Sequence, residues 1–283
     1  MKIYADSATD LPVSFLEQAD VELFPLRVHI EEHDYEDMLG INAKEVYDKI
    51  RDGHQPKTSQ VSPETFLNEF EKLAKNGEKG VYVAFSSELS GTYNTAVMMR
   101  DQVLETYPDF EFAVVDSKAA SLGYGMLVKK AVELRSNGLS VAEVAEGVQA
   151  AIAQVEHFFT VEDLDYMARG GRVSKTSAFV GGLLNIKPVL HVEHGKLIPI
   201  EKVRGRKKVI KRLVELVGEH GVNLDKHTVH ISHGDDEQAA EELKALLTEA
   251  YGVQQFEIQM IGSAIGAHVG PGALSVFFYN TAQ

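Results

Sequence analysis

The chain has 283 residues, 44% hydrophobic and 25% charged, which is enough for one large or two modest globular domains. It contains no cysteine, so disulfide bonds, thiolate nucleophiles and cysteine-ligated metals are excluded. Its net charge of −14 argues against general nucleic-acid binding, because that binding depends on lysine and arginine side chains that neutralise phosphates.

Strands and helices are predicted to alternate through the first half of the chain. The hydrophobic pattern predicts strands over residues 2–5, 22–30, 80–85 and 111–115. It predicts helices over residues 43–51, 63–75, 91–107, 123–136 and 141–154. This alternation is typical of right-handed βαβ crossovers, so we expect an α/β fold whose parallel sheet is covered by helices on both faces.

The second half mixes crossovers with a hairpin. Its predicted strands are residues 157–161, 228–232 and 255–261, with a hairpin over 188–203 that turns at His194-Gly195. Its predicted helices are residues 176–184, 207–220 and 237–251. Hairpin pairing beside crossovers favours a mixed sheet, so we expect a first domain over residues 1–157 and a second over 158–283.

Positive charge is concentrated in the second half. Residues 169–212 contain twelve lysines and arginines but only two acidic residues, Glu193 and Glu201. Such asymmetry within an acidic chain suggests an acidic partner or surface, although a solvated basic face is the simpler interpretation.

Three polar loops carry the candidate binding residues. They are residues 57–63, 86–93 and 262–272. In the second loop, Ser90 and Gly91 precede a predicted helix, whose free N–H groups and dipole favour an anion such as a carboxylate. The competing interpretation is that Ser90 only caps the helix.

The first and third loops are less specific. Thr58 and Ser59 lie too early to cap the helix predicted from residue 63, which leaves both hydroxyls available to a ligand. The third loop has four glycines and a proline, typical of a tight backbone against a ligand. His268 is its one titratable side chain, and a lone histidine is more often structural than functional.

Six ordered motifs resemble signatures of the DegV family. They are Asp6-Ser7-Ala8-Thr9-Asp10-Leu11-Pro12, Thr58-Ser59-Gln60, Ser86–Thr92, the segment 163–172, Ile186-Lys187-Pro188 and the segment 266–273. Two small departures are Val61, where proline is commoner, and Ser275, where glycine is frequent.

The N-terminus lacks signal-peptide features, no apolar run approaches the roughly 20 residues that cross a bilayer, and cysteine is absent, so we expect a soluble cytoplasmic protein. The resemblance implies a two-domain α/β protein that needs no cofactor and binds one long-chain fatty acid between its domains. Several family members are the binding subunit of bacterial fatty acid kinase, whose separate catalytic subunit phosphorylates the carboxylate. By motif position, the resemblance places Thr58, Ser59, Ser90, Gly91 and His268 at the ligand. It places Arg172 and Arg204 at the pocket mouth, where they contact the kinase. Transient contact with a membrane surface is a further expectation.

A bound acyl chain requires an apolar tunnel. Burying sixteen carbons yields at most about 12 kcal/mol at about 0.8 kcal/mol per methylene, so a buried tail is favoured over a shallow groove. The apolar segment 177–184, with two glycines, is a candidate wall, and an ordinary core helix is the alternative.

Two other functions compete with a lipid carrier. Ser90, His268 and Asp116 are the residues of a hydrolytic triad on an unrelated spacing, although the chain has no Gly-x-Ser-x-Gly elbow. A carrier of phosphorylated metabolites would use the same helix N-terminus, but no Walker or kinase signature is present.

Overall fold

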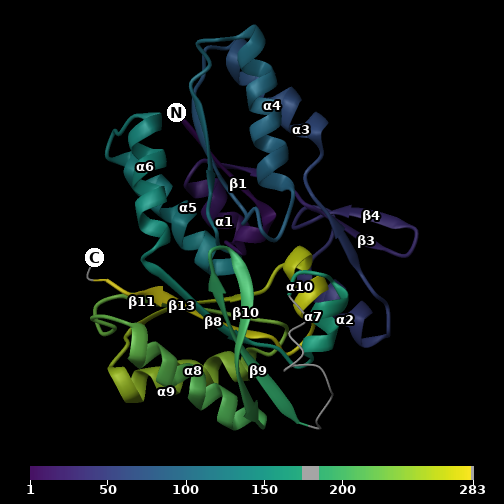
Figure 1. Ribbon diagram of the computed structural model, residues 1–283, viewed down its shortest axis with the longest axis vertical. Helices are drawn as coiled ribbons and strands as arrows, with labels where there is room; N and C mark the ends of the chain where they lie inside the picture. The colour runs from purple at the N-terminus through teal and green to yellow at the C-terminus, as the bar shows by residue number, and fades with distance from the viewer. Residues whose placement is uncertain (174–184, 282–283) are drawn as a thin grey trace.

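Four parallel strands form the first sheet of the computed structural model, which describes residues 1–173 and 185–281 (Figure 1). The sheet has the order β2-β1-β6-β7. Its strands are β1 (Lys2–Asp6), β2 (Val21–Phe24), β6 (Gly80–Ala84) and β7 (Phe112–Asp116). Every residue of β6 is buried, as expected for a central strand covered on both faces.

Helices cover both faces of this sheet (Figure 1). One face carries α3 (Pro63–Lys75) and α4 (Thr92–Thr106), which pack together. The other carries α5 (Ser121–Ser136) and α6 (Val141–Ile152). A shorter helix, α1 (Val13–Gln18), follows the 3-10 turn η1 (Ser7–Thr9). The parallel, three-layered first domain is thus confirmed.

A six-stranded mixed sheet forms the second layer of the molecule. Its order is β10-β9-β8-β13-β11-β12, in which β11 and β12 run parallel and the other neighbours antiparallel. The strands are β8 (Val155–Thr160), β9 (Ile186–Glu193), β10 (Lys196–Arg204), β11 (Thr228–His233), β12 (Gln255–Met260) and β13 (Leu274–Tyr279). The helices α8 (Arg206–His220) and α9 (Glu237–Tyr251) cover one face, and α5 of the first domain meets the other (Figure 1).

The mixed sheet confirms the expectation for the second half. The predicted hairpin is present, and its turn has left-handed backbones at His194 (φ 50°) and Gly195 (φ 84°). Two consecutive positive φ values suit the right-handed twist of the flanking strands. The helix predicted over residues 176–184 lies outside the described residues. None of the helices in the described ranges combines the length and apolar composition needed to cross a bilayer.

The single strand predicted over residues 22–30 is wrong. It divides into β2 and β3 (Arg27–Ile30), which belong to different sheets, because Pro25 lacks the N–H that a continuous ladder needs. β3 pairs with β4 (His33–Glu36) and β5 (Lys57–Ser59) in a three-stranded antiparallel sheet that the pattern did not predict. This small sheet places β5, which carries Thr58, against the helix near the C-terminus described next.

The glycine-rich segment predicted as a loop near the C-terminus contains the helix α10 (Ser263–Val269). It packs on α2 (Ala43–Arg51) because Gly266 allows a close approach. A Cβ at Gly266 would lie 2.8 Å from the Tyr47 hydroxyl oxygen. Tyr47 donates its hydroxyl to the Ile261 carbonyl at 3.1 Å and so ties α2 to the start of this helix. The glycines here serve helix packing as well as turns.

Candidate functional site

A small cavity lies where the first sheet, the three-stranded sheet and α10 meet. Its volume is about 70 Å³. We call it the site cavity, and its lining residues are Leu26, Thr58, Ser59, Gln60, Phe85, Leu89, Ser90, Ala120, Met167, Arg172, Leu197, Ala264, Ile265, His268 and Val269. The loop after β6 supplies Phe85, Leu89 and Ser90, so the cavity lies at the carboxyl edge of the parallel sheet, the usual binding edge of α/β domains.

Thr58 and His268 meet in this cavity although 210 residues separate them. The Oγ1 atom of Thr58 lies 2.6 Å from Nε2 of His268. Burial and, to a smaller extent, the nearby Arg172 guanidinium lower the pKa of the His268 imidazole to about 4. The ring is therefore neutral at pH 7, so it can fix the orientation of the Thr58 hydroxyl without adding a charge.

Ser59 is placed differently from its neighbour. Successive side chains of a strand point to opposite faces, so Ser59 on β5 turns away from Thr58. Its exposed hydroxyl lies 2.9 Å from Nε2 of His29. Ser59 thus borders the cavity, but its hydroxyl is engaged elsewhere.

Ser90 and Gly91 immediately precede the first residue of α4. The N-cap is Gly91, which offers no side-chain cap, and Ser90 lies one residue earlier. The Oγ atom of Ser90 lies 2.8 Å from Oγ1 of Thr92 and accepts the Thr92 N–H at 3.3 Å. The Ser90 side chain therefore makes only a long hydrogen bond to the first turn of α4, and Ser90 lines the site cavity. This geometry leaves the anion interpretation of the helix N-terminus open.

Gly91 makes room for Gln60, a lining residue that the sequence did not single out. A Cβ at Gly91 would lie 2.1 Å from Oε1 of Gln60. The amide of Gln60 donates to Oγ1 of Thr95 at 2.7 Å, which joins the first polar loop to α4. Gly91 does not line the cavity itself but positions a side chain that does.

A wider and more exposed cavity of about 310 Å³ adjoins the site cavity and shares Thr58, Arg172 and His268 with it. We call it the mouth. Its cationic residues are Lys57, Arg169 and Arg172, and of the described residues that line the mouth or the site cavity none is acidic. This charge pattern suits an anionic ligand group.

The two arginines expected at the mouth have different positions. Arg172 lines both cavities, and its guanidinium donates to the carbonyls of Leu89 (3.4 Å) and Gly170 (2.6 Å). Arg204 is exposed at the far end of β10 and lines neither cavity. It lies seven residues beyond Leu197 of the site cavity, about 23 Å along an extended strand.

A third cavity of about 50 Å³ extends the site cavity toward the mixed sheet. The two share Ala120, Leu197, Ile265 and Val269. We call it the deep cavity, and its remaining lining residues are Ser121, His157, Phe159, Val192, Ile261, Ala273, Ser275 and Phe277. Mouth, site cavity and deep cavity therefore form a row that runs from a cationic surface to a largely apolar end. The wall expected at residues 177–184 lies outside the described part of the chain.

The β9–β10 hairpin extends from the mixed sheet toward the first domain (Figure 1). Its turn touches the loop after β6, where the Ser86 hydroxyl donates to the Gly195 carbonyl at 2.9 Å. A Cβ at Gly195 would lie 2.5 Å from the Ser86 oxygen, so the glycine is required for the contact as well as for the turn. Leu197, just past the turn, then lines both the site cavity and the deep cavity.

Comparison with known proteins identifies the family. A family model described as an uncharacterised protein of the DegV family matches residues 1–281. The chain belongs to the DegV family. A DegV domain-containing protein of Clostridium perfringens is 40% identical over 279 residues, which cover 98% of this chain and 96% of the relative.

Solved DegV structures share the whole fold. The fatty-acid-binding DegV family protein of Thermus thermophilus superposes with a TM-score of 0.88 at 30% identity and 98% coverage of each chain. A stearic-acid-binding protein of Eubacterium ventriosum gives a TM-score of 0.88 at 30% identity, covering 98% of this chain and 97% of that one.

The hydrolytic triad considered as an alternative does not assemble in this DegV structure. Asp116 bonds to Lys118 at 2.9 Å and accepts the Ser87 N–H at 3.1 Å. His268 contacts Thr58 rather than Ser90, and the groups that shift its pKa include no carboxylate. Because a triad needs a histidine between the serine and the acid, the geometry gives no support to an esterase.

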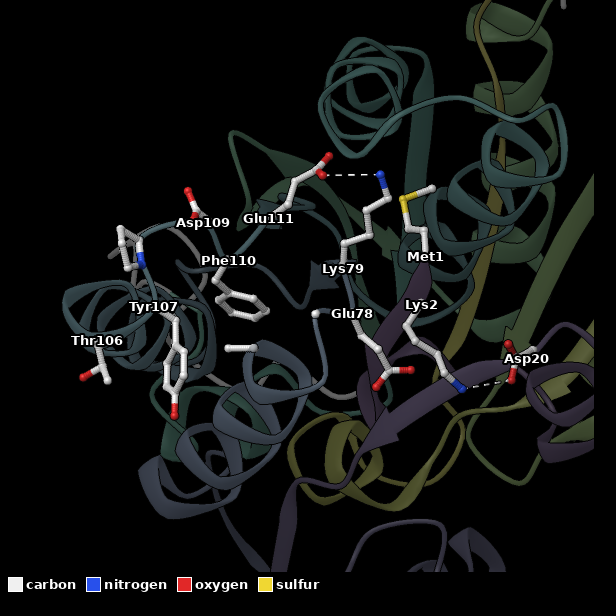
Figure 2. Close-up of a pocket in the computed structure, with 13 residues that line it drawn as sticks. Met1, Lys2, Asp20, Glu78, Lys79, Thr106, Tyr107, Asp109, Phe110 and Glu111 are labelled. Atoms are coloured by element: carbon white, nitrogen blue, oxygen red, sulfur yellow. Dashed lines mark hydrogen bonds and ion pairs between the residues drawn. The ribbon is translucent and has the colours of Figure 1, made fainter.

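A larger hollow of about 830 Å³ lies at the opposite edge of the first sheet (Figure 2). It surrounds the amino ends of β1, β6 and β7, whereas α/β sheets bind ligands at the carboxyl ends. Its charged side chains are partly paired with each other, as in Lys2–Asp20 (3.5 Å) and Lys79–Glu111 (3.3 Å). The smaller row of cavities is therefore the candidate binding site.

Asp10 anchors the elements on either side of the site. Its carboxylate accepts the Gly262 N–H at 2.9 Å, just before α10, and the hydroxyl of Ser121 at the start of α5. Burial raises the pKa of this carboxyl to about 7, although the Ser121 hydrogen bond opposes the shift. The native state thus binds this proton more tightly than the unfolded chain, whose aspartate pKa is about 3.9.

The stabilising contribution of this raised pKa is complete below about pH 4 and is lost as the pH rises through about 7. The variant Asp10→Asn has no carboxyl group at this position to titrate. As the pH rises from 5 to 8, we therefore expect the unfolding free energy of the wild type to fall by about 2–3 kcal/mol relative to that of the variant. Denaturant titrations of both proteins across this range measure the difference. A constant difference would show that Asp10 does not change its protonation state.

Proposed function

We propose that this DegV chain binds one long-chain fatty acid and presents its carboxylate to a separate kinase. The observation that carries the proposal is the row of cavities, which runs from a cationic mouth without acidic lining residues to an apolar end. The ligands of relatives at about 30% identity support it, since the Thermus and Eubacterium ventriosum proteins bind fatty acids.

The carboxylate end of the ligand belongs in the site cavity. Thr58 and Ser90 line this cavity with hydroxyl-bearing side chains, and Ser90 lies just before the N-terminus of α4, the positive end of the helix dipole. Hydroxyls and helix N-terminal amides can hold a carboxylate without a buried cation, because the helix dipole supplies partial positive charge. Neutral His268 orients Thr58, so its hydroxyl hydrogen is directed at the ligand when Nε2 donates to Oγ1.

The alkyl tail of the ligand belongs in the deep cavity. Ala120, Leu197, Ile265 and Val269 form the passage between the two cavities. Each buried methylene contributes about 0.8 kcal/mol, so the tail supplies most of the affinity and the carboxylate contacts set its orientation. The narrow passage selects a linear chain over bulky apolar ligands.

The partner kinase transfers the γ-phosphoryl group of ATP to the bound carboxylate, forming an acyl phosphate and ADP. An exposed basic face on the second domain is the proposed contact for this kinase and for transient contact with an anionic membrane surface. Its residues are Arg204, Lys207, Lys208 and Lys211. Within the described ranges, no acidic side chain pairs with these four cations. By contrast, the neighbouring Arg206 and Arg212 are neutralised by Asp236 (2.7 Å) and Glu201 (2.7 Å).

Native mass spectrometry of the protein purified from bacteria tests the binding function. We expect each chain to carry one fatty acid, identified after denaturing extraction. A protein that keeps its ligand-free mass after incubation with a panel of free fatty acids would contradict the proposal and leave the fold assignment intact.

Arg172→Ala and Arg204→Ala separate lipid binding from transfer to the kinase. The exposed Arg172 guanidinium contributes about 1 kcal/mol or less to a bound carboxylate, so its loss raises the Kd less than about fivefold. We expect both variants to bind fatty acid nearly as well as the wild type and to slow acyl-phosphate formation by the kinase. Loss of lipid binding in Arg172→Ala as large as that in a Thr58 variant would make Arg172 a pocket residue.

A further inference from the structure

A glycine within α5 controls how closely the mixed sheet approaches the first domain. A Cβ built at Gly123 would lie 2.3 Å from Cε1 and 2.4 Å from Nδ1 of His157, and 2.8 Å from Cδ1 of Phe277. Gly123 has no left-handed φ, and glycine inside a helix costs about 1 kcal/mol relative to alanine. The glycine is therefore explained by space for the His157 ring rather than by backbone conformation.

His157 lines the deep cavity but not the site cavity, which contains Thr58 and Ser90. It lines the deep cavity together with Phe277, against which its ring packs edge to face with 5.6 Å between centroids. The side chain is only 6% exposed, and no hydrogen-bond partner for its Nδ1 atom occurs among the described residues. Burial lowers the pKa of this imidazole to about 4, with a smaller contribution from His191, so the ring is neutral at pH 7.

A neutral imidazole can border an alkyl tail, whereas a charged ring in this position would carry a large desolvation cost. The Cε1 and Nδ1 atoms of the ring lie against Gly123 of α5, and the ring also borders the deep cavity. The position of the ring therefore limits the depth of the cavity, and Gly123 determines that position.

We propose that His157, resting on Gly123, is the floor of the tunnel and sets the longest acyl chain that the protein accepts. The inference rests on the proposed function and adds the residues that determine chain length.

Gly123→Ala tests the proposal because the added methyl group should push the His157 ring into the deep cavity and shorten the tunnel. Carbon atoms in contact lie about 3.5–4.0 Å apart, so the new methyl group displaces the His157 ring by about 1 Å or more toward the cavity. Each terminal methylene that loses its place weakens binding about fourfold. With about one or two methylenes excluded, we expect the Kd of the longest acid that the wild type accepts to rise about 4- to 15-fold. The Kd of dodecanoic acid should not change.

His157→Ala lowers the floor and should have the opposite effect. Removing the ring deepens the cavity, so the profile of Kd against chain length shifts toward longer acids. The double variant Gly123→Ala/His157→Ala is the matched control, because the added methyl group then has no imidazole to displace. We expect its profile to follow that of His157→Ala.

Isothermal titration with a series of saturated acids from twelve to twenty carbons measures all four profiles, after circular dichroism has shown that the variants are folded. A double variant that stays restricted to shorter acids would assign the floor to Phe277 instead. Wild-type profiles in both single variants would refute the role of His157 but leave fatty acid binding intact. A wild type that bound none of the acids would instead refute the proposed function.

Discussion

Ala120→Phe should abolish tight binding of long-chain fatty acids. Ala120 precedes α5 and lines both the site cavity and the deep cavity, so a phenyl ring there occupies the passage between them. A sixteen-carbon acid that loses about seven buried methylenes loses about 5–6 kcal/mol, which raises its Kd roughly 10⁴-fold. Titration calorimetry with hexadecanoic acid measures this loss.

Two comparisons separate a blocked passage from a damaged protein. An eight-carbon acid ends before the blocked passage, so its affinity should be the same in Ala120→Phe and in the wild type. Ala120→Gly adds no bulk and keeps an N-cap residue that helices tolerate, so it should bind the long acid normally. Tight binding of hexadecanoic acid by a folded Ala120→Phe variant would show that the tail takes another route.

The combined substitution Thr58→Val/Ser90→Ala should weaken binding of every fatty acid, whatever its length. Both hydroxyls line the site cavity, and a hydrogen bond to a charged group contributes about 1.5–3 kcal/mol. Losing two such bonds raises the Kd by about 10²- to 10⁴-fold. Valine keeps the shape of threonine, so the fold should survive the loss of the Thr58–His268 hydrogen bond.

Ser59→Ala is the matched control for this pair. Ser59 is adjacent to Thr58, but its hydroxyl lies beside His29 on the other face of β5. We expect wild-type affinity in this variant. If Ser59→Ala weakened binding while Thr58→Val/Ser90→Ala did not, the carboxylate would lie on the opposite side of the strand. Equal affinities in all three proteins would place the carboxylate away from both hydroxyls.

The elements with strong periodicity were predictable because their residues act locally. The helix over residues 63–75 starts after Ser62, whose side chain accepts the Thr65 N–H, and it carries Pro63 in its first turn. The hairpin turn at His194-Gly195 likewise follows from short-range backbone preferences. The two failures, at residues 22–30 and in α10, occur where Pro25 redirects the chain and where packing on Tyr47 decides the conformation.

Some residues of the candidate site could likewise be found from the sequence, and others only from the structure. Thr58, Ser90 and His268 were selected from the sequence as ligand contacts because polar residues beside predicted helix and strand ends, within family motifs, suggest such contacts. Their role as ligand contacts stays a prediction, and the structure places all three in the lining of one cavity. Ala120 was not selected, since alanine carries no chemical signal of its own, and Gln60 appeared only as part of the motif Thr58-Ser59-Gln60. The orientation of Ser59 and the distance of Arg204 from the mouth also required the three-dimensional structure.

The sequence by itself determined the family, the alternation of strands and helices, and the hydroxyl-bearing loops, because these depend on short-range order along the chain. The tertiary structure alone decided which loops meet. The contact between Thr58 and His268, and the fit of Gly123 against His157, join residues on separate elements of the fold. Such contacts depend on how sheets and helices pack, and local residue preferences do not encode that packing.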